Sequence, residues 1–206
     1  MKSILKIDHL PFFINYHNLS FNYCWLATLR IFLYGAIALF LWGCVAQGVI
    51  GADAGGKASE VEWGGGVSAA IGKPLPSGKT SIYGFGSYHY YTFTGGHDNL
   101  LQLGIQARQN LNLLAERFWI GGLAAWVYDA SVFDDDYYSV NPSANGFSIG
   151  TLGGYRIPLE AININVFSGL TLIKFGDFKS NSTIVEPAHT SLQFRIGAEL
   201  EIPFHE

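Results

Sequence analysis

The C-terminal stretch from Ser191 to Phe204 alternates strictly between apolar and polar positions. Its apolar positions are Leu192, Phe194, Ile196, Ala198, Leu200, Ile202 and Phe204. The intervening positions hold polar residues and one glycine, including Arg195 and Glu199. A period of two predicts a β-strand with one apolar and one polar face. At about 3.3 Å per residue and a tilt of about 40°, this strand rises roughly 30 Å, close to the thickness of a bilayer.

The same pattern recurs along most of the chain and predicts seven strands. They cover Glu60–Gly72, Thr80–Phe93, Leu101–Leu113, Arg117–Ser131, Phe147–Ile157, Ala161–Phe175 and Ser191–Phe204. Short connections at 115–116 and 158 alternate with long loops at 132–145 and 176–188, as in outer-membrane barrels. Single-chain bacterial barrels have an even number of strands, so an eighth strand comes either from Gln47–Gly56 or from splitting a loop.

Alternation alone fits both a membrane barrel and a soluble ligand-binding barrel, because the two differ only in which face is inside. The polar face here consists of Gly, Ser, Gln and Asn with few charges, which suits a narrow interior. Its charged residues are Glu62, Arg108, Arg156, Arg195 and Glu199. We expect them to form a charge network in the lumen, either as structural filling or as part of a pore or gate. Each arginine would cost about 2–4 kcal/mol at the midplane if it faced lipid, and each glutamate somewhat less.

Aromatic residues gather near the predicted strand ends. Tyr83 and Phe85 oppose Tyr91 and Phe93 on one strand, while Phe118 opposes Trp126 and Tyr128 on another. Ten residue steps separate Phe118 from Tyr128, or about 25 Å along the barrel axis. This spacing predicts two aromatic girdles on the outer wall and favours the membrane barrel.

Composition narrows the class of protein further. Only 14% of the residues are charged, and the chain contains 25 Gly and 2 Cys. The net charge of −4, with no basic cluster, argues against nucleic acid as a partner. Both cysteines lie near the N-terminus, so no disulfide framework is expected in the barrel.

Residues 1–46 are predicted to be a signal peptide with a long N-terminal region, and residues 47–206 the barrel. Arg30 precedes the apolar run from Ile31 to Ile50, as in a secretory signal. Cleavage after Ala46 and acylation of Cys44 are both compatible with the sequence. The run is also long enough for an uncleaved membrane helix, and translation could begin near Leu29 or Arg30.

These features resemble the small bacterial outer-membrane β-barrel proteins of the OmpX and OmpA-barrel type. The resemblance covers residues 47–206 and rests on alternation, connection lengths and aromatic placement. It implies an all-β, closed, antiparallel up-and-down transmembrane barrel of about eight strands. It also implies location in the bacterial outer membrane and contact with outer-membrane lipid. The chain departs from the common pattern because His205 and Glu206 follow the terminal Phe204.

The sequence predicts an outer-membrane protein with a structural or surface-interaction role. We expect no catalysis and no cofactor or metal, and we expect contacts with an extracellular ligand or protein through loops 132–145 and 176–188. One alternative is a lipid-modifying enzyme that uses His97 or His189 with nearby acids at the extracellular rim. Those acids are Asp98, Asp134, Asp135, Asp136 and Glu186. They could also bind a divalent cation, or simply be solvated loop residues. A soluble periplasmic ligand-binding barrel is the other alternative.

Overall fold

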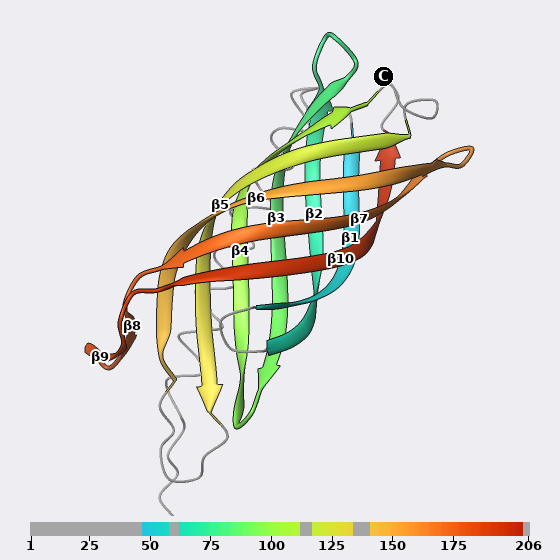
Figure 1. Ribbon diagram of the computed structural model, residues 1–206. Coiled ribbons are helices and arrows are strands. Elements are labelled where there is room, and N and C mark those ends of the chain that lie inside the picture. Colours follow the sequence, from blue (N-terminus) through green and yellow to red (C-terminus); the bar gives the residue numbers. More distant parts are fainter. Residues whose placement is uncertain (1–46, 58–61, 112–116, 134–140, 204–206) are drawn as a thin grey trace, which may run out of the picture. The chain divides into compact units, whose positions relative to one another are not determined.

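The computed structural model describes residues 47–57, 62–111, 117–133 and 141–203. Their strands are β1 (Gln47–Lys57), β2 (Glu62–Pro74), β3 (Thr80–Phe93), β4 (Gly96–Asn110), β5 (Phe118–Phe133), β6 (Ser143–Pro158), β7 (Asn163–Phe175), β8 (Phe178–Ser180), β9 (Thr183–Glu186) and β10 (Thr190–Pro203). The eight long strands form a closed antiparallel ring (Figure 1). Strands β1 to β6 each pair with the next strand in the chain, β7 pairs with β10, and β10 pairs with β1. The predicted eight-stranded barrel is confirmed, and its eighth strand is β1.

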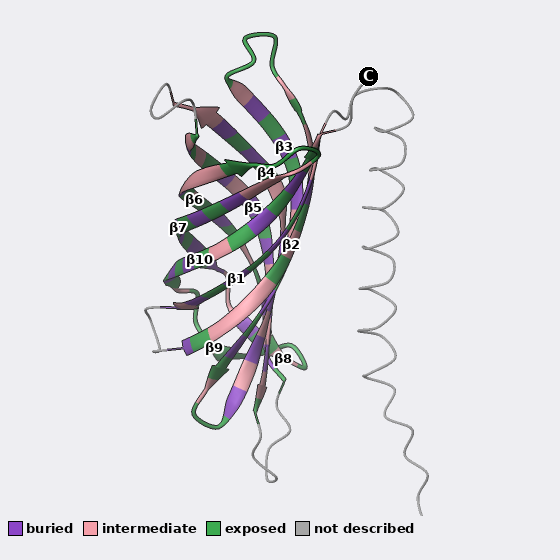
Figure 2. Cartoon of the chain, turned by 90° about the vertical axis from the view of Figure 1, so that its right-hand side faces the viewer, coloured by how far each residue is buried: buried purple, intermediate pink, exposed green. Residues whose placement is uncertain are grey.

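Buried and exposed residues alternate along the strands, as the bands in Figure 2 show. On β10, Gln193 and Arg195 are buried, whereas the neighbouring Phe194 and Ile196 are exposed. The polar face therefore lines the lumen and the apolar face forms the outer wall. The exposed apolar positions of β10 run from Leu192 to Ile202, ten steps that rise about 25 Å, the height of the apolar band in outer-membrane barrels.

Strand β3 corrects the prediction of the aromatic girdles. Tyr83, Phe85 and Tyr91 point into the lumen and are at most 5% exposed, so they do not belong to an outer girdle. The outward aromatic residues of β3 are Tyr88 and Tyr90. Aromatic residues occupy both faces of this strand, so their spacing alone does not reveal which face meets lipid.

On β5 and β6 the aromatic residues do lie on the outer wall. Phe118 packs edge-on against Tyr155 at one end of the barrel, with ring centroids 5.0 Å apart. Trp126 stacks on Tyr128 toward the other end, with centroids 6.3 Å apart. The girdle prediction therefore applies to Phe118, Trp126 and Tyr128 but not to β3.

The predicted loop 176–188 is largely a β-hairpin, which corrects the sequence prediction. Strand β8 pairs with the start of β6, and β9 pairs back onto β8, so the β7–β10 hairpin extends past the barrel wall (Figure 1). Asn181 and Ser182 form its tip with φ angles of 49° and 70°. Such left-handed pairs make the two-residue turns that close hairpins. The other predicted loop is also shorter than 132–145, since β5 runs to Phe133 and β6 starts at Ser143.

The two ends of the barrel differ in the connections they carry. The terminal end holds the start of β1, the end of β10 and the connections 75–79 and 159–162. The loop end holds the connections 94–95 and 176–189, together with the end of β5 at Phe133 and the start of β6 at Ser143. Gln47 pairs with Pro203, which places both ends of the barrel chain on the same side.

The predicted signal peptide, its cleavage near Ala46 and the acylation of Cys44 concern residues 1–46, which lie outside the described residues. The last four residues of the apolar run, 47–50, belong to β1 rather than to a helix. In the described part of the chain, no helix has the length and apolar character needed to span a membrane.

Candidate functional site: the charged lumen

The lumen carries charged side chains along its length because several strands have acids or bases at their inward-facing positions. Asp53, for example, lies between the exposed Ala52 and Ala54 on β1, so its carboxylate points inward. The inward charged residues among those described are Asp53, Lys57, Glu62, Asp98, Arg108, Asp129, Arg156, Arg195, Glu199 and Glu201. The five residues predicted from the sequence are all among them.

Arg108 and Glu199, two of the predicted residues, form an ion pair. Their Nη1 and Oε2 atoms lie 2.8 Å apart, although 91 residues separate them in the chain. The Arg108 guanidinium also lies over the rings of Tyr83 and Trp119, at 4.9 and 4.5 Å from their centroids. Cation–π contacts of this kind strengthen when the cation is desolvated. Arg108 therefore links β4 to β10 across the lumen and packs against two aromatic rings.

Arg195 pairs with Asp53 and His89, two residues that the sequence reasoning did not select. Its Nη1 atom lies 3.6 Å from Asp53 Oδ2 and 3.3 Å from His89 Nε2. His89 Nε2 lies 3.1 Å from Asp53 Oδ1, and both side chains are almost fully buried. The three groups join β1, β3 and β10 in the middle of the lumen.

Near the terminal end, Glu201 accepts hydrogen bonds from three side chains. The donors are Arg156 Nη2 at 3.2 Å, Asn163 Nδ2 at 3.2 Å and Asn165 Nδ2 at 3.1 Å. Arg156 was predicted from the sequence, but Glu201 was not. The strict alternation of β10 places Glu201 on the same face as Arg195 and Glu199, so this signal was present in the sequence.

Toward the loop end, Lys57 is surrounded by carboxylates. Its Nζ atom lies 2.6 Å from Asp98, 2.9 Å from Asp129 and 3.2 Å from the predicted Glu62. The Lys57 cluster, as we call these four residues, joins β1, β2, β4 and β5. One ammonium faces three carboxylates, so the cluster holds the excess of acid over base among the described lumen residues.

The Lys57 cluster corrects the interpretation of Asp98 as a solvated loop residue. Asp98 is 6% exposed, because the connection at 94–95 is so short that β4 already begins at Gly96. Its neighbour His97 faces the other way and stacks on Tyr90 with centroids 4.8 Å apart. Asp98 therefore belongs to the lumen and His97 to the outer wall.

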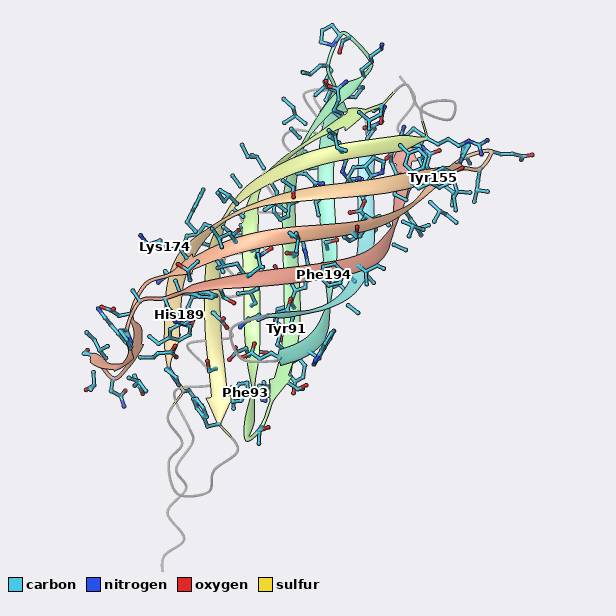
Figure 3. All side chains as sticks on the ribbon, viewed as in Figure 1. Tyr91, Phe93, Tyr155, Lys174, His189 and Phe194 are labelled. Carbon is cyan, nitrogen blue, oxygen red and sulfur yellow. The ribbon has the colours of Figure 1, made fainter. Side chains whose placement is uncertain are left out.

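His189 lies at the loop end in an aromatic setting. Its ring stacks on Phe178 at 5.5 Å and leans on Phe175 at 5.2 Å, while Nδ1 lies 2.9 Å from Glu186 Oε1. Figure 3 places it beside the base of the β8–β9 hairpin. The contacts of His189 and His97 do not bring them together, and residues 134–136 lie outside the described residues. Within the described ranges, no group of His, Cys, Asp and Glu has the arrangement of a metal site.

Apolar side chains fill much of the remaining lumen in two clusters, which the sequence reasoning did not predict. One includes Phe85, Trp119, Leu123 and Phe167, and the other includes Tyr91, Leu100, Val127, Ile173 and Phe175. A cavity of about 20 Å³ beside Arg195 and Glu199 has room for roughly one water molecule. A chain of polar contacts from Ser87 through Gln102 and Gln193 to Tyr91 crosses the lumen nearby.

Comparisons with known proteins place this fold among bacterial barrels. No family model and no curated protein matches the sequence. The structure is similar to that of Neisserial surface protein A, with a TM-score of 0.52 and 11% identity over 79% of this chain and 97% of that one. The translocator domain of the autotransporter NalP from Neisseria meningitidis gives a TM-score of 0.40 and 13% identity, over 75% of this chain and 62% of that one. The similarity to the surface protein confirms the fold that the sequence predicted, an eight-stranded barrel of the outer-membrane type.

Proposed function

We propose that this chain is a protein of the bacterial outer membrane with a structural role and with surface contacts made at its loop end. The observation that carries the proposal is the distribution of apolar residues. Trp63, Val67, Ile105 and Phe147 are each more than half exposed on the outer wall, while ion pairs lie inside. Apolar side chains on this scale suit lipid and would be unfavourable in water.

The orientation in the membrane follows from the positions of the chain ends. In bacterial barrels the termini and short turns face the periplasm, and the longer loops face outward. The loop end of this barrel would then present the β8–β9 hairpin to the exterior. On the hairpin, Ile184 and Val185 are about half exposed, at 55% and 51%. These side chains are available for contact with a surface partner.

The lumen charges support a structural role rather than transport. Each predicted residue of the network contacts an oppositely charged group from another strand, and the apolar clusters occupy the space between the ion pairs. Side-chain filling of this kind is expected for a barrel of eight strands. We therefore assign Glu62, Arg108, Arg156, Arg195 and Glu199 to the stabilisation of the closed barrel.

Membrane insertion and orientation can be tested together in intact cells. Ser182, at the hairpin tip, and Ser77, in the connection 75–79, are each replaced by cysteine in a chain without Cys24 and Cys44. A membrane-impermeant maleimide should label S182C in intact cells, and S77C only after the outer membrane is permeabilised. A heat-modifiability gel on the same membranes checks that both variants are folded. Recovery of a soluble, unshifted protein, or labelling of S77C first, would overturn the proposal.

A further inference from the structure

Lys174 is a charged residue on the outer wall of the barrel. It is exposed on β7, whereas its neighbours Ile173 and Phe175 are buried in the lumen. Figure 3 shows it on the same side of the barrel as His189 and far from Tyr155 at the terminal end. Unlike Lys57, which has three carboxylates within 3.2 Å, Lys174 has no ion-pair partner among the described residues.

The surroundings of Lys174 on the wall are aromatic or neutral. Strand register places it opposite Phe147 of β6 on one side and opposite Thr190 of β10 on the other. Phe147 in turn lies opposite Trp126 of β5, and both rings are exposed. The row Trp126, Phe147, Lys174 and Thr190 therefore crosses four adjacent strands on the outer wall.

The level of Lys174 within the membrane follows from the outward residues before it on β7. The outward positions of β7 are apolar from Leu170 to Leu172, and Lys174 is the next outward residue toward the loop end. A lysine on the lipid face costs about 2–4 kcal/mol at the midplane but only about 0–1 kcal/mol near the interface. Aromatic residues also concentrate at the interface. Lys174 therefore lies where the apolar band meets the lipid headgroups.

We propose that Lys174 binds the phosphate of an anionic lipid headgroup, with Thr190 as a second hydrogen-bond donor. This inference rests on the proposed insertion in a membrane. The ammonium supplies three donors and the threonine hydroxyl one, while the phosphate supplies the charge that the protein does not provide at this position. The exposed Phe147 ring beside Lys174 packs against the acyl chain of the same lipid. The partner is thus a lipid of the bilayer and not a soluble anion.

The test compares the full barrel in vesicles of phosphatidylcholine alone and in vesicles that also contain phosphatidylglycerol. Urea unfolding gives the folding equilibrium constant in each kind of vesicle. The ratio of the two constants is the gain that the anionic lipid produces. Lys174→Gln should reduce this gain about five-fold, the contribution of one lysine at an anionic surface. Lys174→Arg should retain it. Lys179→Gln is the matched control, because it removes the same charge from β8, the next strand after β7 in the chain.

Three outcomes would overturn the proposal. The first is an equal gain from anionic lipid in wild type and Lys174→Gln. The second is a reduction of this gain in Lys179→Gln as large as in Lys174→Gln, which would indicate unspecific attraction. The third is inorganic phosphate in phosphatidylcholine vesicles reproducing the gain, which would make the ligand a soluble anion. Failure of the proposed function is distinguishable, because the wild-type barrel would then fail to insert into either kind of vesicle.

Discussion

Replacing Lys57 with methionine tests whether the Lys57 cluster holds the loop end of the barrel together. The substitution keeps the length and much of the apolar stem of the side chain but removes the ammonium. Glu62, Asp98 and Asp129 would then face one another without the cation that lies 2.6–3.2 Å from each of them. All three carboxylates are buried, so water offers little compensation.

The expected cost of Lys57→Met is large on the scale of protein stability. Removing one partner of a buried ion pair typically costs about 3–5 kcal/mol, because the remaining charge stays buried without compensation. Three carboxylates lose their shared cation here, so we expect a value near the upper end of this range. Lys57 also lies 5.2 Å from the Tyr91 ring centroid and 5.7 Å from that of Phe175, and these cation–π contacts are lost as well.

The assay is equilibrium unfolding in urea of the barrel folded into vesicles, followed by tryptophan fluorescence and by gel mobility. Lys73→Met is the control, since Lys73 is exposed at the other end of the barrel, and it should change the unfolding free energy by less than about 0.5 kcal/mol. Adding Asp129→Asn to Lys57→Met should recover part of the loss, because one of the three charges disappears. Equal stability of wild type and Lys57→Met, or a double variant less stable than Lys57→Met, would refute the reasoning.

Three further predictions concern packing, the outer wall and chemistry. Gly154→Val should destabilise the barrel by about 1–3 kcal/mol in urea unfolding, because an added Cβ would lie 2.4 Å from the Trp119 indole. Gly84→Val is the control and should have little effect, because a Cβ added at Gly84 would meet nothing within 4 Å. Ile196→Arg should cost about 2–4 kcal/mol and lower the heat-modifiable fraction in membranes, and an unchanged fraction would contradict the lipid-facing assignment. His189→Ala should leave the acylation of lipid A unchanged by mass spectrometry, and an altered profile would support the enzymatic alternative.

The outer wall was largely predictable from the sequence because alternation carries the information directly. On β10 the two faces differ in polarity at almost every position, so the strand specifies which side meets lipid. On β3 this contrast fails, since Tyr88 and Tyr90 lie on one face and Tyr83 and Tyr91 on the other. The polar residues of the lumen face, Ser87 among them, decide the orientation, and aromatic spacing alone misleads.

The pairing of charges across the lumen was not predictable from the same pattern. Alternation shows that Arg195 points inward, but its partner depends on the stagger between strands and on how far each strand turns around the barrel. The structure places Asp53 and His89 beside Arg195, and neither residue is among the five lumen residues predicted from the sequence. Asp53 lies in β1, the strand whose position was left open, so this contact could not be inferred.

The arrangement of the ion pairs favours a closed lumen over a conducting one. Lys57 joins β1 to β4 and β5, Arg108 joins β4 to β10, and Arg156 joins β6 to β10, so these contacts span strands that are not neighbours in the barrel. Side-chain filling of the interior is expected for a barrel of eight strands. These contacts therefore support the proposed structural role, in which the outer wall and the loop end are the surfaces for interaction.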